Sequence, residues 1–157
     1  MKTEEDYAFA AFDEQSLMTV DFERMQRVAT LILRDAGVKR AKLEFVVLEA
    51  EPMREMNVQF LGHDYATDVL AFPIERDLKR GALEGSVVVC SDVAQERAKD
   101  FNWSPEEELL LYVAHGMLHL VGYDDHSPSD APIMRAKERE YLAAVGVDAS
   151  KAREGEE

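Results

Sequence analysis

One segment of the chain, residues 106–126 (EEELLLYVAHGMLHLVGYDDH), constrains the fold more than any other. Between residues 109 and 121 it is apolar at nearly every position, so a helix formed there has no polar face. A helix that is apolar all round is stable when other elements cover it on every side. The segment therefore predicts a helix in the centre of a domain, with the rest of the chain packed around it.

Two histidines interrupt this apolar segment. His115 and His119 are four residues apart, which places them one turn apart on the same helix face. Gly122 can adopt the left-handed conformation that ends many helices, and a turn there can return a third imidazole, His126. Three histidines with an open fourth position are typical of a catalytic zinc site, with one zinc ion per chain. The alternative is a set of hydrogen-bonded core histidines, although burying several imidazoles without a ligand is costly.

The residues between the turn and the third histidine could take part in the same chemistry. Zinc lowers the pKa of a bound water toward about 7, and a nearby carboxylate can orient a ligating histidine or act as a base. Asp124 and Asp125 are placed for either catalytic role, and the alternative is a solvated turn. The HExxH pattern of metallopeptidases needs a glutamate where this chain has Gly116, so peptide hydrolysis by that mechanism is not expected.

Composition limits the class of protein. A chain of 157 residues with 46% hydrophobic residues is long enough for one domain with a real core. The longest apolar run is shorter than the roughly 18 residues that span a bilayer, and the acidic N-terminus does not resemble a signal peptide. The single cysteine, Cys90, excludes an internal disulfide and suits a reducing compartment, so we expect a cytoplasmic protein without membrane contact. The net charge of −14 disfavours non-specific attraction to nucleic acid, although local charge decides specific binding.

Hydrophobic periodicity and capping signals predict the remaining elements. Ser104 and Glu107 predict a capping box at the start of the central helix. Helices are expected over residues 22–36, 52–61, 92–102, 105–121 and 130–145, and strands over 41–49, 69–72 and 85–91, with a further edge strand within residues 1–20. Residues 76–83 are expected to form a loop or hairpin, and Pro73 indicates an edge strand or a strand end. The prediction is one α+β domain over residues 1–147, with a small mixed sheet of three to four strands, about five helices and the HxxxH helix at the centre. Residues 148–157 are polar and predict a disordered tail.

Three segments resemble motifs of one known family. HGMLHLVGYDDH resembles the HGxLHLxGYDH signature of the YbeY family of zinc-dependent endoribonucleases. MNVQFLGHDYATDVLAFP is similar to that family's LNxxYRxxDxxTDVLSFP segment, and LEGSVVVCSDVAQERA is similar to its LGDIVIS strand and the following helix. The segments occur in the family's order and extend over residues 55–126 or so.

The resemblance implies an α+β fold and a zinc-dependent hydrolase that cuts single-stranded RNA. It also implies a role in ribosomal RNA maturation, at the 3′ end of 16S rRNA, and in ribosome quality control. The implied partners are ribosomal RNA and the ribosome or its small subunit. Carried over to this chain, the metal ligands are His115, His119 and His126.

The chain departs from the family pattern at three positions, one of which is Ser86 in place of the aspartate of LGDIVIS. The family's third histidine directly follows GYD, whereas here Asp125 intervenes, so the third ligand is either His126 or Asp125. We favour His126, because an aspartate lowers the charge of the site, although carboxylate oxygen is an acceptable zinc ligand. Leu61 stands where the family commonly has an arginine that is associated with RNA phosphate.

Further polar residues could bind the substrate. His63, Thr67 and Asp68 lie in and after the HDYATD loop, which is alternatively an ordinary capped turn. The basic candidates for phosphate contacts, each alternatively a surface charge, are Lys39, Arg40, Arg76, Lys79 and Arg80. Two other functions also fit the sequence: a ribosome-associated binding factor with a mainly structural metal, and a metal-dependent hydrolase of another substrate.

Overall fold

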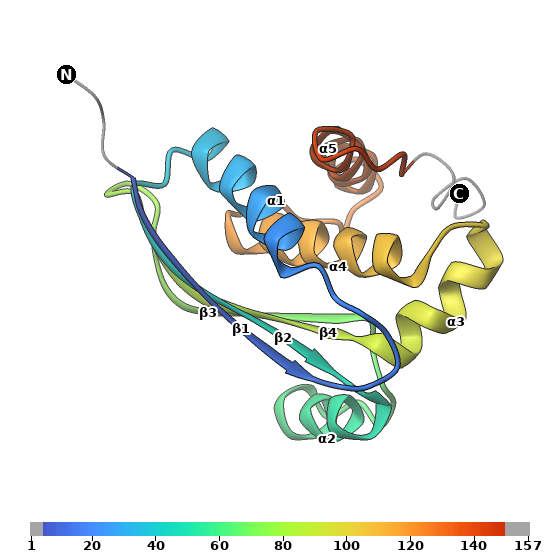
Figure 1. Cartoon of the computed structure of the whole chain (residues 1–157). Helices are drawn as coiled ribbons and strands as arrows, with labels where there is room; N and C mark the ends of the chain where they lie inside the picture. The colour runs from blue at the N-terminus through green and yellow to red at the C-terminus, as the bar shows by residue number, and fades with distance from the viewer. Residues whose placement is uncertain (1–4, 150–157) are drawn as a thin grey trace.

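The computed structural model describes residues 5–149, which form one four-stranded sheet and five helices (Figure 1). The strands are β1 (Asp6–Glu14), β2 (Arg40–Leu48), β3 (Val69–Asp77) and β4 (Ala82–Cys90). The helices are α1 (Phe22–Asp35), α2 (Ala50–Leu61), α3 (Ser91–Phe101), α4 (Pro105–Leu120) and α5 (Asp130–Ala143). The predicted α+β class, with its small mixed sheet and central HxxxH helix, is confirmed.

The sheet has the strand order β1-β2-β4-β3. β1 and β3 form the two edges of the sheet; β1, β2 and β4 are parallel, whereas β3 runs antiparallel to β4. The sequence predicted that strand to end near Phe72, but it continues to Asp77 and turns directly into β4. Pro73 lies within this edge strand, next to a register irregularity, which confirms the edge position that proline indicates.

Helices cover the two faces of the sheet unequally. Figure 1 shows α1 and α4 side by side over one face with α5 packed above them, while α2 lies against the other face. α4 contacts β3, β4, α1, α3 and α5, so neighbours surround it. Eleven of its sixteen residues are buried, which explains why the sequence of this helix is apolar on every side.

Two local features fix the position of α4. Ser104 accepts a hydrogen bond from the Glu107 N–H, and the Glu107 carboxylate accepts one from the Ser104 N–H, so the predicted capping box is formed. Further along, a Cβ atom on Gly116 would lie 2.8 Å from a methyl group of Val87. The helix therefore approaches the sheet more closely here than any residue with a side chain would allow. This packing gives a structural reason for glycine at the position where metallopeptidases have glutamate.

The end of α4 redirects the chain back over the helix. Gly122 has a φ angle of +108°, which few residues other than glycine adopt, as the sequence predicted. The Gly122 N–H donates to the His119 carbonyl at 3.0 Å, and the Tyr123 N–H donates to the Leu118 carbonyl at 2.9 Å. These two bonds close the last turn and direct residues 123–126 toward the histidines.

The chain beyond α5 packs against the same core. Val147 and Ala149 are both buried, so the described part of the predicted tail begins inside the domain. Residues 150–157 of that tail lie outside the described residues. None of the helices that the structure describes is long and apolar enough to cross a membrane.

Candidate metal centre

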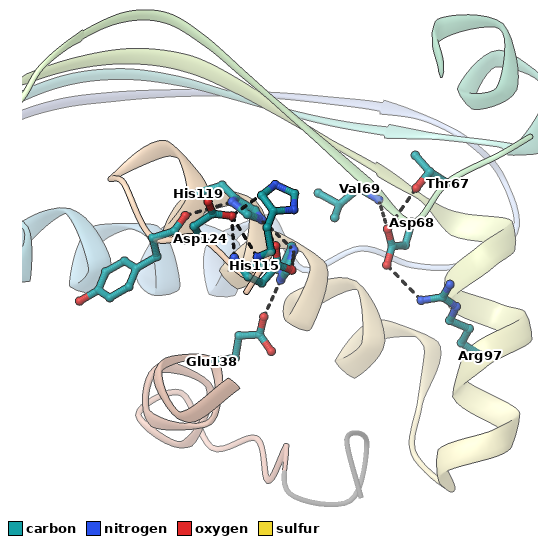
Figure 2. A network of polar contacts seen from close by, with 11 residues as sticks. Thr67, Asp68, Val69, Arg97, His115, His119, Asp124 and Glu138 are labelled. Carbon is teal, nitrogen blue, oxygen red and sulfur yellow. Dashed lines mark hydrogen bonds and ion pairs between the residues drawn. The ribbon is translucent and has the colours of Figure 1, made fainter. Parts of the chain in front are cut away.

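His115 and His119 lie close together on one flank of α4 that is partly open to solvent. Their Nε2 atoms are 3.1 Å apart and their rings meet edge to face, with centroids 4.6 Å apart. Both imidazoles are half-buried, because α5 and the turn after α4 cover part of this flank. The predicted juxtaposition of these two histidines is therefore present in the folded chain (Figure 2).

The other ring nitrogen of each histidine has its own partner. The Nδ1 atom of His115 lies 2.6 Å from a carboxylate oxygen of Glu138, and the Nδ1 atom of His119 lies 3.1 Å from the carbonyl oxygen of Tyr123. A carboxylate and a carbonyl only accept hydrogen bonds, so these partners assign the proton to Nδ1 in both rings. The two Nε2 lone pairs then face each other at 3.1 Å, an arrangement that a shared cation would stabilise.

Asp125 completes this cluster. Its two carboxylate oxygens lie 3.4 Å from Nε2 of His115 and 3.5 Å from Nε2 of His119. One ligand atom from each of the three residues falls within 4.8 Å of the others. Two nitrogen ligands of a tetrahedral zinc ion are themselves about 3.3 Å apart, given Zn–N bonds of about 2.0–2.1 Å. The donors and their spacing therefore fit a zinc ion.

His126, the favoured third ligand, lies outside the cluster. Its side chain is 84% exposed, its Nε2 atom is 3.3 Å from a carboxylate oxygen of Asp124, and its ring centroid is 6.5 Å from that of His119. The Asp124 carboxylate also accepts the N–H groups of Asp125 at 2.7 Å and of His126 at 3.2 Å. Asp124, Asp125 and His126 form a second, exposed group of possible ligands. The geometry favours Asp125 as third ligand, and the predicted role of His126 stays a prediction.

Burial favours the metal-binding form of His119. Loss of solvent around His119 lowers the pKa of its imidazole below the usual value, and the neighbouring His115 lowers it further. The carboxylate of Asp125 acts in the opposite direction but does not outweigh burial. The neutral imidazole, which is the form that binds metal ions, is therefore favoured near neutral pH.

Sequence reasoning missed the buried partner of His115. Glu138 is only 1% exposed and extends from α5 toward the back of the histidine (Figure 2). A signal was present in the sequence, because Glu138 stands between Met134 and Leu142 at helical spacing, on the face that packs into the core. A carboxylate at the core-facing position of a helix is rare unless it is paired.

The three predicted substrate residues fall in two places. His63 lies in the loop after α2, where its ring stacks on the exposed ring of Tyr65 with centroids 5.6 Å apart. Thr67 and Asp68 lie at the start of β3, where Asp68 forms an ion pair with Arg97 of α3 at 3.0 Å (Figure 2). The structure therefore joins Thr67 and Asp68 to a basic residue that sequence reasoning did not single out.

Among the basic residues proposed for phosphate contacts, two have clear partners. Arg76 donates to the carbonyl of Leu120 at 3.5 Å, at the C-terminal end of α4. Arg80 lies 3.7 Å from Asp77 and is largely exposed in the turn between β3 and β4. Neither contact identifies a phosphate site.

Fold and cluster together define the class of protein. It is a small α+β domain whose central helix presents two imidazoles beside a carboxylate, in the arrangement of a metal-binding enzyme domain.

Comparison with known proteins identifies the family. The model of the family described as "Endoribonuclease YbeY" matches residues 10–146, and the chain belongs to this family. A protein named "Endoribonuclease YbeY" from Chlorobium phaeovibrioides is 36% identical over 131 residues, which cover 83% of this chain and 86% of the relative. One of the same name from Salinibacter ruber is 39% identical over 132 residues, covering 80% and 84%.

A solved structure agrees on the fold. The solution structure of a Thermotoga maritima protein superposes with a TM-score of 0.58 at 24% sequence identity. The superposition covers 93% of this chain and 89% of the other. At this level of identity the likeness concerns the fold.

Proposed function

We propose that this protein is a zinc-dependent endoribonuclease that cuts single-stranded RNA during ribosomal RNA maturation. The observation that carries the proposal is the cluster of His115, His119 and Asp125 in a member of the YbeY family. Bound zinc would supply a Lewis acid that activates water near neutral pH and stabilises negative charge on a phosphodiester.

The chain's own groups prepare this cluster before any ligand arrives. Glu138 holds the proton of His115 on Nδ1, and the Tyr123 carbonyl does the same for His119, so each Nε2 atom carries the lone pair that a metal ion binds. Asp124 binds two consecutive backbone N–H groups of the turn and thereby places Asp125 beside the histidines. In this proposal Asp125 is a ligand and Asp124 is the residue that positions it, rather than a base.

The choice of Asp125 changes the charge of the site. Two neutral imidazoles and one carboxylate leave a zinc ion with a net charge of about +1, against +2 with three imidazoles. The alternative ligand set has His126 in place of Asp125, and it requires the turn to bring a largely exposed ring inward. Variants at the two positions separate the two ligand sets.

The broader setting follows from the family. We propose that residues 1–147 act as one catalytic domain, that the substrate is ribosomal RNA, and that the protein meets it on the ribosome or its small subunit in the cytoplasm. A role in ribosome quality control belongs to the same proposal. The family membership supports these statements.

Metal analysis combined with RNA cleavage tests the proposal. Purified wild-type protein is expected to contain about one zinc ion per chain and to cut single-stranded RNA, and His119→Ala is expected to lose both. His63→Ala is the matched control for zinc content, because it removes a histidine that lies outside the cluster. Wild-type protein that cuts RNA without bound metal, or that carries zinc but cuts no RNA, would contradict the proposal.

A further inference from the structure

A polar network at the start of β3 holds an arginine in place. The Arg97 guanidinium donates from Nη1 to one carboxylate oxygen of Asp68 at 3.0 Å. The other Asp68 oxygen accepts the Val69 N–H at 2.8 Å and the Thr67 hydroxyl at 3.3 Å. The carboxylate is therefore fixed by the backbone, and it fixes the direction of Arg97 (Figure 2).

This network lies beside the metal cluster. Val69 follows Asp68 directly, and its side chain lies 3.2 Å from where a Cβ atom on Gly116 would be, next to His115 on α4. The network also lies near Tyr112, one turn before Gly116: burial and Glu108 raise the pKa of Tyr112, Asp68 raises it further and Arg97 lowers it. Figure 2 shows the network and the histidines in one view, on either side of Val69.

The guanidinium has donors left for a ligand. Its side chain is 45% exposed, and within residues 5–149 the structure shows one hydrogen-bonded partner for it, Asp68. Arg54, by contrast, is bound by the carboxylates of both Glu51 and Asp64. Arginine presents five N–H donors in a planar fork that matches phosphate oxygens, so Arg97 can keep Asp68 and still bind a phosphate.

We propose that Arg97 binds a backbone phosphate of the RNA strand, next to the phosphodiester at the metal cluster. The inference rests on the proposed function and names the residue that anchors its substrate. In a chain with a net charge of −14, close approach of a polyanion needs a local cation, and Arg97 is held in place beside the cluster. Asp68, predicted from the sequence to bind substrate, then acts by orienting Arg97.

The test replaces Arg97 with an uncharged donor. Arg97→Gln keeps an N–H group for Asp68 but removes the charge, and Arg97→Lys keeps the charge without the planar fork. Lys99→Gln is the matched control, since it removes one positive charge from an exposed position on the same helix. Cleavage kinetics give KM and kcat on a labelled single-stranded RNA. Fluorescence anisotropy in a His119→Ala background gives Kd at several salt concentrations without cleavage.

Arg97→Gln is expected to raise KM and Kd about tenfold and to change kcat by less than about threefold. It is also expected to reduce the slope of the logarithm of the binding constant against the logarithm of salt concentration by about 0.7. Arg97→Lys is expected to recover the salt slope and part of the affinity, and Lys99→Gln to behave like wild type. If wild-type protein cuts RNA and Arg97→Gln binds with unchanged affinity and salt slope, the inference is wrong. Wild-type protein that neither binds nor cuts RNA would overturn the proposed function, and with it this inference.

Discussion

The C-terminal half of α4 and the turn that follows it, residues 121–129, both supply groups to the candidate metal centre, but they hold them differently. His115 and His119 are half-buried on a helix packed on every side, and each has its second nitrogen bonded. Asp125 and His126 are more exposed, and the carboxylate of Asp124 holds their backbone. In the proposed metal centre, the helix fixes two ligands, whereas the turn decides which residue becomes the third and so sets the charge of the site.

The sharpest test of this comparison exchanges the two possible third ligands. Loss of a hydrogen-bond partner behind a metal ligand typically lowers metal affinity about 10- to 100-fold, and loss of the ligand itself lowers it at least as much. Asp125→Asn is therefore expected to weaken zinc binding by at least about 100-fold. His126→Ala is expected to change the affinity by less than about fivefold, because its ring is largely exposed. Competition with a chelating dye measures both affinities. The reverse order of effects would identify His126 as the ligand.

A substitution that disturbs the packing of α4 against the sheet should have the next largest effect. Gly116→Ala places a methyl group 2.8 Å from a methyl group of Val87 and should destabilise the metal-free protein by about 2 kcal/mol. Urea unfolding monitored by circular dichroism measures this change. Gly122→Ala is not a matched control, because the φ angle of Gly122 strains any side chain. Unchanged stability of Gly116→Ala would mean that α4 can shift without cost.

Replacement of Glu138, the partner of His115, should have a smaller effect, and it should change zinc affinity rather than the stability of the fold. Glu138→Gln keeps an oxygen that accepts the Nδ1 proton but removes the negative charge, and it should weaken zinc binding about tenfold. Glu140→Gln on the same helix is the control, since Glu140 is exposed and pairs with Lys137. Cobalt substitution followed by absorption spectroscopy detects the change at the metal. An identical affinity in Glu138→Gln would leave this carboxylate without a role at the centre.

The smallest effect is expected at the other end of the helix. Ser104→Ala removes the hydroxyl that accepts the Glu107 N–H and should cost about 1 kcal/mol of stability. Zinc affinity should not change, because the capping box lies at the opposite end of α4 from His119. Thermal unfolding and metal titration on the same sample check both statements. A loss of zinc affinity in Ser104→Ala would show that the two ends of the helix are coupled.

Much of the fold followed from local signals in the sequence. The apolar run of α4, the capping box at Ser104 and the glycine at position 122 predicted a buried helix with defined ends, and all three features are present. These signals are readable because each depends on residues near one another in the chain. The length of β3 was underestimated, since its later residues are polar and their pairing with β4 is what makes them a strand.

The amino-acid sequence by itself determined the central helix, the histidine pair one turn apart, and a returning turn rich in possible ligands. Which group of that turn meets the pair was decided only in three dimensions, because Asp124 binds successive N–H groups and so sets the direction of Asp125 and His126. Glu138 contacts His115 from α5, and Arg97 pairs with Asp68 from α3; both helices are separate from α4 in the chain. Spacing along a chain reports on neighbours within one element, whereas partners from different elements depend on how those elements pack.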